Sequence, residues 1–79
     1  MYYVYIFRSE KDGSYYTGVT TDIEKRLLEH NSGSSKYSSS HKPFIHIWSC
    51  SFSDKKKAYG FEEYLKSGSG IAFRNRHLI

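Results

Sequence analysis

Residues 2–19 read YYVYIFRSEKDGSYYTGV, which is an apolar run, a polar turn and a second tyrosine-rich run. The first run alternates between two faces that are both apolar, so we expect a strand that is covered on both sides. Asp12-Gly13 is a hairpin turn signal, and residues 15–19 then form the return strand. Gly18 lacks a side chain at a point where another group can approach the backbone closely. This stretch therefore predicts the first hairpin of a sheet.

Beyond the hairpin, helical and extended patterns follow each other. Thr21 and Glu24 have the spacing of a capping box, which predicts a helix that runs to about Asn31. Residues 32–42 are rich in serine, and we interpret them as a loop because each flank is too short to fold alone. Residues 44–52 then form a third strand.

The C-terminal third is predicted to be helical. Ser53-Asp54 caps a second helix at about 55–66, and the Ser-Gly-Ser-Gly run at 67–70 ends it. Phe73, Leu78 and Ile79 are anchors for a short last helix. The order β-β-α-β-α, followed by that short helix, predicts a mixed α/β (α+β) domain with helices packed on a three-stranded sheet.

The composition describes one small domain, residues 1–79, with an aromatic-rich core of eight Tyr, five Phe and one Trp. Cys50 is the single cysteine, which excludes an internal disulfide and a cysteine cluster for zinc and fits a reducing cytoplasm. No apolar run approaches the ~20 residues of a membrane span, and the N-terminus does not read as a signal peptide. We therefore expect a cytoplasmic protein with no membrane partner.

The charge balance favours a polyanionic partner. Twelve Lys and Arg residues stand against eight Asp and Glu residues, for a net charge of +4. Mild basicity of this kind suits nucleic acid. The alternative is a solvated basic surface that only keeps the protein soluble.

Glu62 is a carboxylate on the side of a helix meant for the core. On a helical projection it shares one face with Ala58, Phe61 and Leu65. An unpaired buried carboxylate costs several kcal/mol, so Glu62 needs a cation, a network of donors or a metal. A structural salt bridge with Lys66 or Arg26 is the alternative to a functional role.

Arg26 and His30 lie one turn apart and border the apolar face of the first helix, which Ile23 and Leu27 define. Each has a structural alternative. Arg26 can be a surface arginine whose stem covers apolar area, and His30 can be a hydrogen-bonded histidine near a helix C-terminus. Together they suit the rim of a cleft that is backed by the sheet.

Most of the tyrosines build the core, but two on adjacent hairpin strands can point their hydroxyls at one spot. A phenol has a pKa of about 10 and needs a nearby cation to act as a base at neutral pH. Arg26 and a metal ion would supply that positive field.

These residues resemble the GIY-YIG endonuclease superfamily, and in particular small stand-alone proteins similar to the nuclease module of the bacterial excinuclease. Tyr3-Val4-Tyr5 stands where the family has Gly-Ile-Tyr, and Tyr16-Thr17-Gly18 stands for Tyr-Ile-Gly. The family arginine falls on Arg26, the following His/Tyr position on His30, and the metal-binding glutamate on Glu62. The chain departs from the family at Tyr3, at Thr17 and at Val19, which replaces a lysine, and Asn75 is a candidate for a family asparagine.

The resemblance implies a three-stranded antiparallel sheet flanked by helices and a metal-dependent cleavage of phosphodiester bonds. Glu62 would hold one Mg²⁺ or Mn²⁺. Tyr16 would be the general base or would position the water, and Tyr5 would help to orient that water. Arg26 would stabilise charge on the phosphate, and His30 would relay a proton or hold a tyrosine hydroxyl.

The expected partner is DNA, with RNA as an open alternative, in repair or recombination. The cations predicted to contact nucleic acid are Lys36, Lys42, Lys66 and Arg74. Because the chain has no room for a separate recognition domain, specificity would come from substrate shape or from a protein partner. Two rival hypotheses are a nucleic-acid-binding module of the same fold with little or no cleavage, and a purely structural domain.

Overall fold

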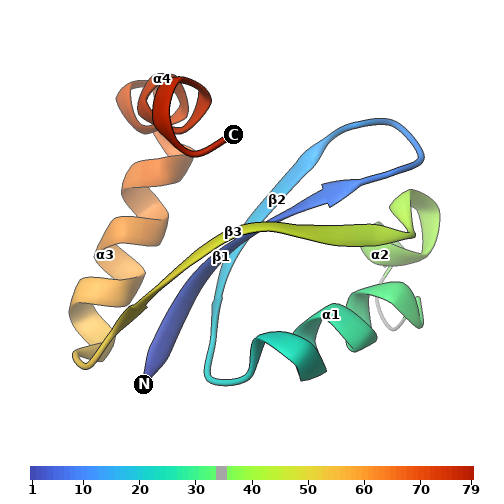
Figure 1. Ribbon diagram of the computed structural model, residues 1–79, viewed down its shortest axis with the longest axis horizontal. Coiled ribbons are helices and arrows are strands. Elements are labelled where there is room, and N and C mark those ends of the chain that lie inside the picture. Colours follow the sequence, from blue (N-terminus) through green and yellow to red (C-terminus); the bar gives the residue numbers. More distant parts are fainter. Residues whose placement is uncertain (34–35) are drawn as a thin grey trace.

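The fold is built on a three-stranded antiparallel sheet (Figure 1). The computed structural model describes residues 1–33 and 36–79, and of residues 36–38 it describes the backbone alone. The strands are β1 (Tyr2–Ser9), β2 (Tyr15–Thr20) and β3 (Phe44–Phe52), and their order is β2-β1-β3. Both pairings are antiparallel, as the sequence predicts. β1 is therefore central, and β2 and β3 are the two edges.

The described residues form four helices beside the sheet: α1 (Ile23–Asn31), α2 (Lys36–His41), α3 (Lys55–Lys66) and α4 (Gly68–His77). Figure 1 shows α3 and α4 on one side of the strands and α1 with α2 on the other. No helix in the described part of the chain is both long and apolar enough to cross a membrane. The mixed α+β class predicted from the element order is confirmed.

The two faces of β1 belong to two separate cores. Val4 and Ile6 pack with Ala58 and Leu65 of α3. Tyr5 and Phe7 point the other way and pack with Phe44, and Ile23 and Leu27 of α1 cover them. The alternation seen in the first strand thus predicts correctly a sheet that is covered on both sides.

The first helix begins one residue later than the capping box predicts. Asp22, in an extended conformation, is the N-cap, and its side chain accepts a hydrogen bond from the Lys25 backbone N–H at 3.1 Å. Thr21 is not the cap because the short carboxylate of Asp22 reaches the free N–H groups of the first turn directly. The helix ends at Asn31, as predicted.

The prediction of a loop over residues 32–42 is wrong for its second half, which forms α2. Serine is neutral to unfavourable inside helices, so the local sequence carries little helical signal. A six-residue helix is also too short to be stable alone. Contacts with the β1–β2 hairpin support it, and such tertiary contacts cannot be read from the sequence of the segment.

The predicted stop at residues 67–70 ends α3 but does not end the helical region. The Ser67 hydroxyl donates to the Tyr64 carbonyl at 2.6 Å and accepts from the Gly70 N–H at 3.1 Å. One serine therefore closes α3 and caps α4. The last helix has ten residues and is not the short helix expected.

Asn31 ties the end of α1 to the start of β3. Its side-chain oxygen accepts a hydrogen bond from the Phe44 backbone N–H at 2.6 Å, and its amide nitrogen donates to the Phe44 carbonyl at 3.1 Å. The side chain thus imitates a neighbouring strand at this point. The clamp holds α1 against the sheet directly after His30.

We expect Asn31→Ala to lower the free energy of unfolding by about 1–3 kcal/mol, because both hydrogen bonds to Phe44 are lost. Asn31→Asp keeps the accepting oxygen but turns a carboxylate oxygen toward the Phe44 carbonyl, so it should also be destabilising. Urea unfolding of the three proteins measures the difference. Equal stability of Asn31→Ala and the parent chain would contradict a clamp at this position.

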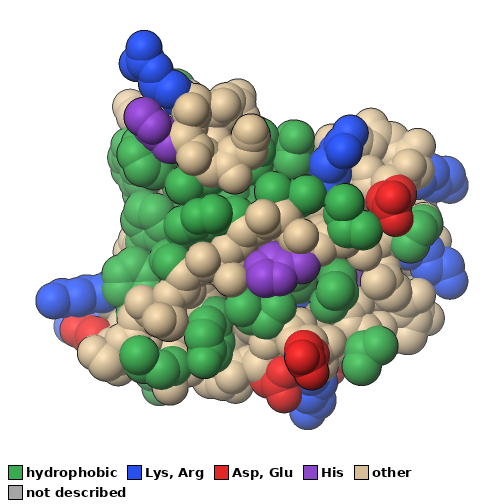
Figure 2. Space-filling model, in the orientation of Figure 1, with side chains coloured by type: hydrophobic (Ala, Val, Ile, Leu, Met, Phe, Trp, Pro, Cys, Tyr) green, Lys and Arg blue, Asp and Glu red, His purple; other side chains and the backbone are tan. Residues whose placement is uncertain are grey.

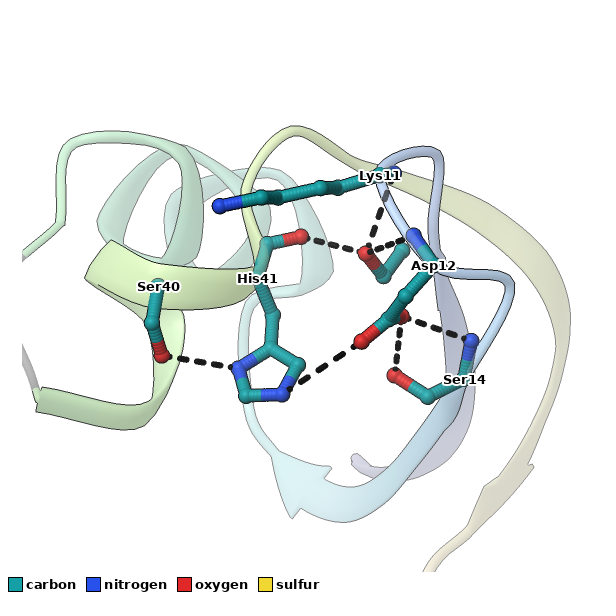
Figure 3. Close-up of polar contacts among 6 residues, drawn as sticks. Lys11, Asp12, Ser14, Ser40 and His41 are labelled. Atoms are coloured by element: carbon teal, nitrogen blue, oxygen red, sulfur yellow. Dashed lines mark hydrogen bonds and ion pairs between the residues drawn. The ribbon is translucent and has the colours of Figure 1, made fainter.

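A polar cluster joins the β1–β2 hairpin to α2 (Figure 3). The Asp12 carboxylate accepts hydrogen bonds from the Ser14 N–H at 2.9 Å and the Ser14 hydroxyl at 2.7 Å, and it lies 3.5 Å from Nε2 of His41. The buried hydroxyl of Ser9 donates to the His41 carbonyl. Hydrogen bonds from Ser14, together with a smaller effect of His41, lower the pKa of Asp12 from 3.8 to about 2.

This lowered pKa makes the free energy of unfolding depend on pH in the acid range. Because the pKa of Asp12 is lower in the folded state, its contribution is present above pH 3.8 and is lost as the pH falls toward 2. We expect the urea midpoint of Asp12→Asn to change less than that of the parent between pH 5 and pH 2. Parallel curves for the two proteins would show that Asp12 makes no such contribution.

Candidate active site

Three of the predicted residues, Tyr5, Tyr16 and His30, meet beside the middle of β2. Gly18 is paired with Tyr5 across the two strands, and Tyr5 is 1% exposed. A Cβ atom on Gly18 would lie 2.7 Å from Cζ of Tyr5 and would overlap its hydroxyl oxygen. The Tyr5 hydroxyl therefore occupies the space that a side chain at Gly18 would fill, which is the close approach that the glycine predicts.

Tyr16 and His30 stand beside Tyr5. The Tyr5 and Tyr16 rings are stacked, with centroids 6.3 Å apart, and His30 meets Tyr16 edge-on at 4.6 Å. His30 is 7% exposed and also contacts the rings of Phe7 and Phe44, each at 5.3 Å. The histidine is thus held among aromatic rings at the end of α1.

One hydrogen bond fixes the tautomer of His30. Nδ1 lies 3.0 Å from the Arg26 carbonyl oxygen. A carbonyl can only accept, so Nδ1 carries the proton and donates it. In neutral His30 the other nitrogen, Nε2, therefore carries a lone pair and is a proton acceptor.

Arg26 lies on the rim. Its side chain is 40% exposed, and Nε is 3.4 Å from Oε1 of Glu29, one turn further along α1. An ion pair that is this exposed contributes little to stability. The guanidinium can exchange Glu29 for a phosphate without a large loss.

Glu62 is on the core side of α3, as predicted, and its side chain is 14% exposed. Oε2 accepts a hydrogen bond from Nζ of Lys66 at 2.8 Å. This is one of the two salt bridges that the sequence offers as a structural alternative, and the pairing with Arg26 is not formed. The Lys66 ammonium compensates the charge of a carboxylate that is largely removed from water.

The charges of the site act on the Tyr5 hydroxyl. Burial is the main cause that raises the pKa of Tyr5 well above its ordinary value, and Tyr16, Glu62 and Glu29 add to it, whereas Arg26 opposes it. The combined direction keeps the phenol protonated at every physiological pH. Tyr5 is therefore a neutral group that can donate one hydrogen bond and accept others.

On the face drawn in Figure 2, Lys and Arg side chains do not gather into one large patch. Figure 2 shows hydrophobic side chains gathered over α3 and the nearby part of β3, with Lys and Arg side chains standing at the outline of the molecule. Tyr59, Tyr64, Ile71 and Phe73 are among the exposed large apolar residues. A binding surface for a polyanion therefore has to be sought in the clefts.

Two clefts open beside β2. The first, the Arg74 cleft, has a volume of about 270 Å³, and Tyr15, Tyr16, Lys66 and Arg74 are among its walls. The second, the Lys55 cleft, has a volume of about 260 Å³, and its walls include Thr20, Thr21, Arg26, Lys55 and Tyr59. Tyr16 opens on the first cleft and Arg26 on the second.

The remaining predicted cations are placed differently. Arg74 stands 4.8 Å from the centre of the Tyr15 ring and lines the Arg74 cleft together with Lys66. Lys42 is exposed next to Gly33 and is not a wall of either cleft. The side chain of Lys36 lies outside the described residues. Sequence reasoning missed Lys55 as a wall of the second cleft, because its position beside β2 depends on the topology of the sheet.

The donor set fits a single hard cation. Within the described residues, no three His, Cys, Asp or Glu side chains gather closely enough to hold a metal ion. Mg²⁺ in enzymes that act on phosphates commonly takes one or two carboxylates, and water and phosphate oxygens complete its shell. Glu62 already holds a cationic group, so its partly exposed carboxylate suits such an ion.

Comparison with known families and proteins agrees with this geometry. A family model described as the GIY-YIG catalytic domain matches residues 1–72. The chain is similar to the UPF0213 protein BH0048 of Halalkalibacterium halodurans, with 41% identity over 82% of this chain and 69% of that protein. It is also similar to the UPF0213 protein SH2523 of Staphylococcus haemolyticus, with 39% identity over 86% of this chain and 83% of that protein.

A solved structure shares the fold. The solution NMR structure of the UPF0213 protein BH0048 from Bacillus halodurans aligns with a TM-score of 0.55 and 36% identity, covering 92% of this chain and 81% of that chain. The names of these relatives state no reaction. They establish the family and the architecture, and the chemistry has to be argued from the residues.

We expect Gly18→Ala to lower the free energy of unfolding by about 1–3 kcal/mol, because the new methyl group and the Tyr5 hydroxyl claim the same space. Combining it with Tyr5→Phe, which deletes that oxygen, should cost less than the sum of the two single changes. Thermal unfolding of the four proteins measures the coupling. Additive costs would contradict direct contact at this point.

Proposed function

Because the chain belongs to the GIY-YIG catalytic-domain family, we propose that it is a divalent-metal-dependent endonuclease that hydrolyses phosphodiester bonds in DNA. The observation that carries the proposal is the convergence at Gly18. The charges of Arg26 and Glu62 both act on the Tyr5 hydroxyl, which fills the space above this glycine. A partly exposed carboxylate, an arginine on the rim and two phenols near the middle of β2 suit an attack on phosphate.

Glu62 would hold one Mg²⁺ or Mn²⁺, for which its carboxylate oxygens are suitable ligands. Such an ion supplies stabilisation of the negative charge that develops on the phosphate. Lys66, which pairs with Glu62 at 2.8 Å, would give up that carboxylate and turn toward the nucleic acid. Its exposed side chain can move at little cost, since Lys66 is 55% exposed.

The other residues have separate tasks. Arg26 would bind the phosphate with charge-assisted hydrogen bonds in place of its exposed pair with Glu29. Tyr5, a neutral phenol with a raised pKa, would orient the attacking water and does not act as the base. Tyr16 would position the water or accept its proton, and Nε2 of His30 would accept a proton from a tyrosine hydroxyl.

Lys66 and Arg74 would contact the DNA backbone, and Lys36 and Lys42 are further candidates at the α2 end of the molecule. RNA is an alternative substrate, because backbone contacts and a metal do not distinguish the two. We place the protein in the cytoplasm, in repair or recombination, with a protein partner that supplies specificity.

One observation favours a second candidate function. The ion pair between Glu62 and Lys66 compensates the carboxylate without any metal. In a binding module that keeps the fold and the basic clefts but does not cut, this ion pair alone would be enough to stabilise Glu62. It would bind nucleic acid with an affinity that falls steeply with salt, and it would release no metal-dependent products.

The deciding experiment is cleavage of single-stranded, duplex and branched DNA in Mg²⁺, Mn²⁺ or EDTA. Glu62→Gln should reduce metal-dependent cleavage about 100-fold or more, since a metal ligand is worth several kcal/mol of transition-state stabilisation. Glu63→Gln is the matched control, because it removes the same charge from the adjacent, exposed position. Activity that survives in Glu62→Gln would reject Glu62 as the ligand, and binding without products in the parent chain would favour the binding module.

A further inference from the structure

The Arg74 cleft and the Lys55 cleft lie on opposite sides of Gly18 along β2. Tyr15, Tyr16 and Thr17 line the first, and the second begins at Val19 and Thr20. Gly18 lies between these two groups. The stretch from Tyr16 to Thr20 spans about 13 Å at ~3.3 Å per residue, so the two clefts are close neighbours along one edge of the sheet.

Helix α3 repeats the same order opposite the strand. Tyr59 lines the Lys55 cleft, and Lys66 lines the Arg74 cleft. Glu62 lies between them at spacings of three and four residues, which place all three side chains on one helix face. Along β2 and along α3 the order is therefore the same: residues of one cleft, then Gly18 or Glu62, then residues of the other cleft.

The charge of the two clefts is one-sided. Arg26 and Lys55 line one and Lys66 and Arg74 line the other, and no carboxylate is among the described walls of either. A third cleft, of about 410 Å³ on α3, shares Lys55 with the Lys55 cleft but differs because Asp54 and Glu63 line it, together with Lys56. Within the described residues Arg26 pairs with Glu29 and Lys66 with Glu62, so the cations of these two clefts that form no ion pair are Lys55 and Arg74.

The guanidinium of Arg74 is held in place by neutral neighbours, which leaves its charge available to an anion. Its Nε and Nη2 donate to Oδ1 of Asn75 at 3.2 and 3.0 Å, and its guanidinium stands over the Tyr15 ring at 4.8 Å. These neighbours hold the planar group without neutralising it. Lys55, at the start of α3, forms no ion pair with any described carboxylate.

We propose that the edge of β2 is a track for one unpaired strand of nucleic acid, with the reacting phosphate beside Glu62 and the two neighbouring phosphates in the Lys55 and Arg74 clefts. The inference rests on the proposed function, because it assigns the flanking positions of the same substrate. The β2 residues that line the two clefts are separated by about 13 Å of strand, a length that an extended nucleic-acid strand can follow. One strand can follow a narrow edge of this kind, with its bases turned outward.

The test is binding without cleavage. Fluorescence anisotropy of a labelled oligothymidylate in EDTA, over a series of salt concentrations, gives the slope of log Kd against log salt. Lys55→Ala and Arg74→Ala should each reduce this slope by about 0.7, the value for one phosphate contact with a single strand, and the double variant by about twice as much. Lys56→Ala, which removes the same charge from the third cleft, should leave the slope unchanged.

Three results would overturn the track. The first is a salt slope in Lys55→Ala and Arg74→Ala that equals the slope of the parent chain. The second is a decrease of the slope in Lys56→Ala as large as in those two variants. The third is a decrease of the slope that appears with duplex DNA but not with the single strand. Circular dichroism of each variant confirms that the fold is retained. Because no metal is present, a protein that binds as expected but never cuts would refute the proposed nuclease alone, and one that cuts with unchanged slopes would refute the track alone.

Discussion

The rest of the structure depends on the burial of β1 from both sides. Val4, Tyr5, Ile6 and Phe7 are consecutive, and each is at most 1% exposed. Side chains alternate along a strand, so four buried residues in a row require a layer on each face. The chain supplies α3 for one face and α1 for the other, and β3 for one side of the central strand. β2 and β3 remain as the two edges of the sheet, and Tyr16 and Gly18 of the candidate site lie on β2.

That arrangement explains why the candidate site combines buried and exposed groups. The Tyr5 ring belongs to the core, but its hydroxyl reaches over Gly18, and the surrounding charges act on it there. Glu62 belongs to α3 and compensates its charge with Lys66, whereas Arg26 belongs to α1 and stays on the rim. Groups from both layers can meet only at an edge, because the sheet itself separates them elsewhere.

Much of the fold could be predicted from local patterns. The third strand has the predicted bounds, and the helix over residues 55–66 begins after Asp54, the cap that the sequence predicts. The helical face that contains Glu62 and the rim position of Arg26 also follow from periodicity alone. The helix α2 could not be predicted, because its support comes from Ser9 and Asp12, which are far away in the sequence.

The role of Ser67 was missed for a related reason. The run at 67–70 reads as a helix stop, and only the hydrogen bonds of its hydroxyl show that the stop is also a start. The place of Lys55 beside β2 likewise follows from the pairing of strands and not from the lysine run in which it stands. Such features depend on tertiary contacts, which a single sequence does not display.

The shared serine has a consequence for how the chain can vary in length. Ser67 leaves no free residue between α3 and α4, so the number of residues from Glu62 to Arg74 sets the direction in which the arginine points. One residue more or less in either helix would turn every later side chain by about 100°, which would carry Arg74 away from Tyr15. The junction at Ser67 thus fixes the separation of Glu62 and Arg74. Insertions and deletions are better accommodated outside this stretch than between these two residues.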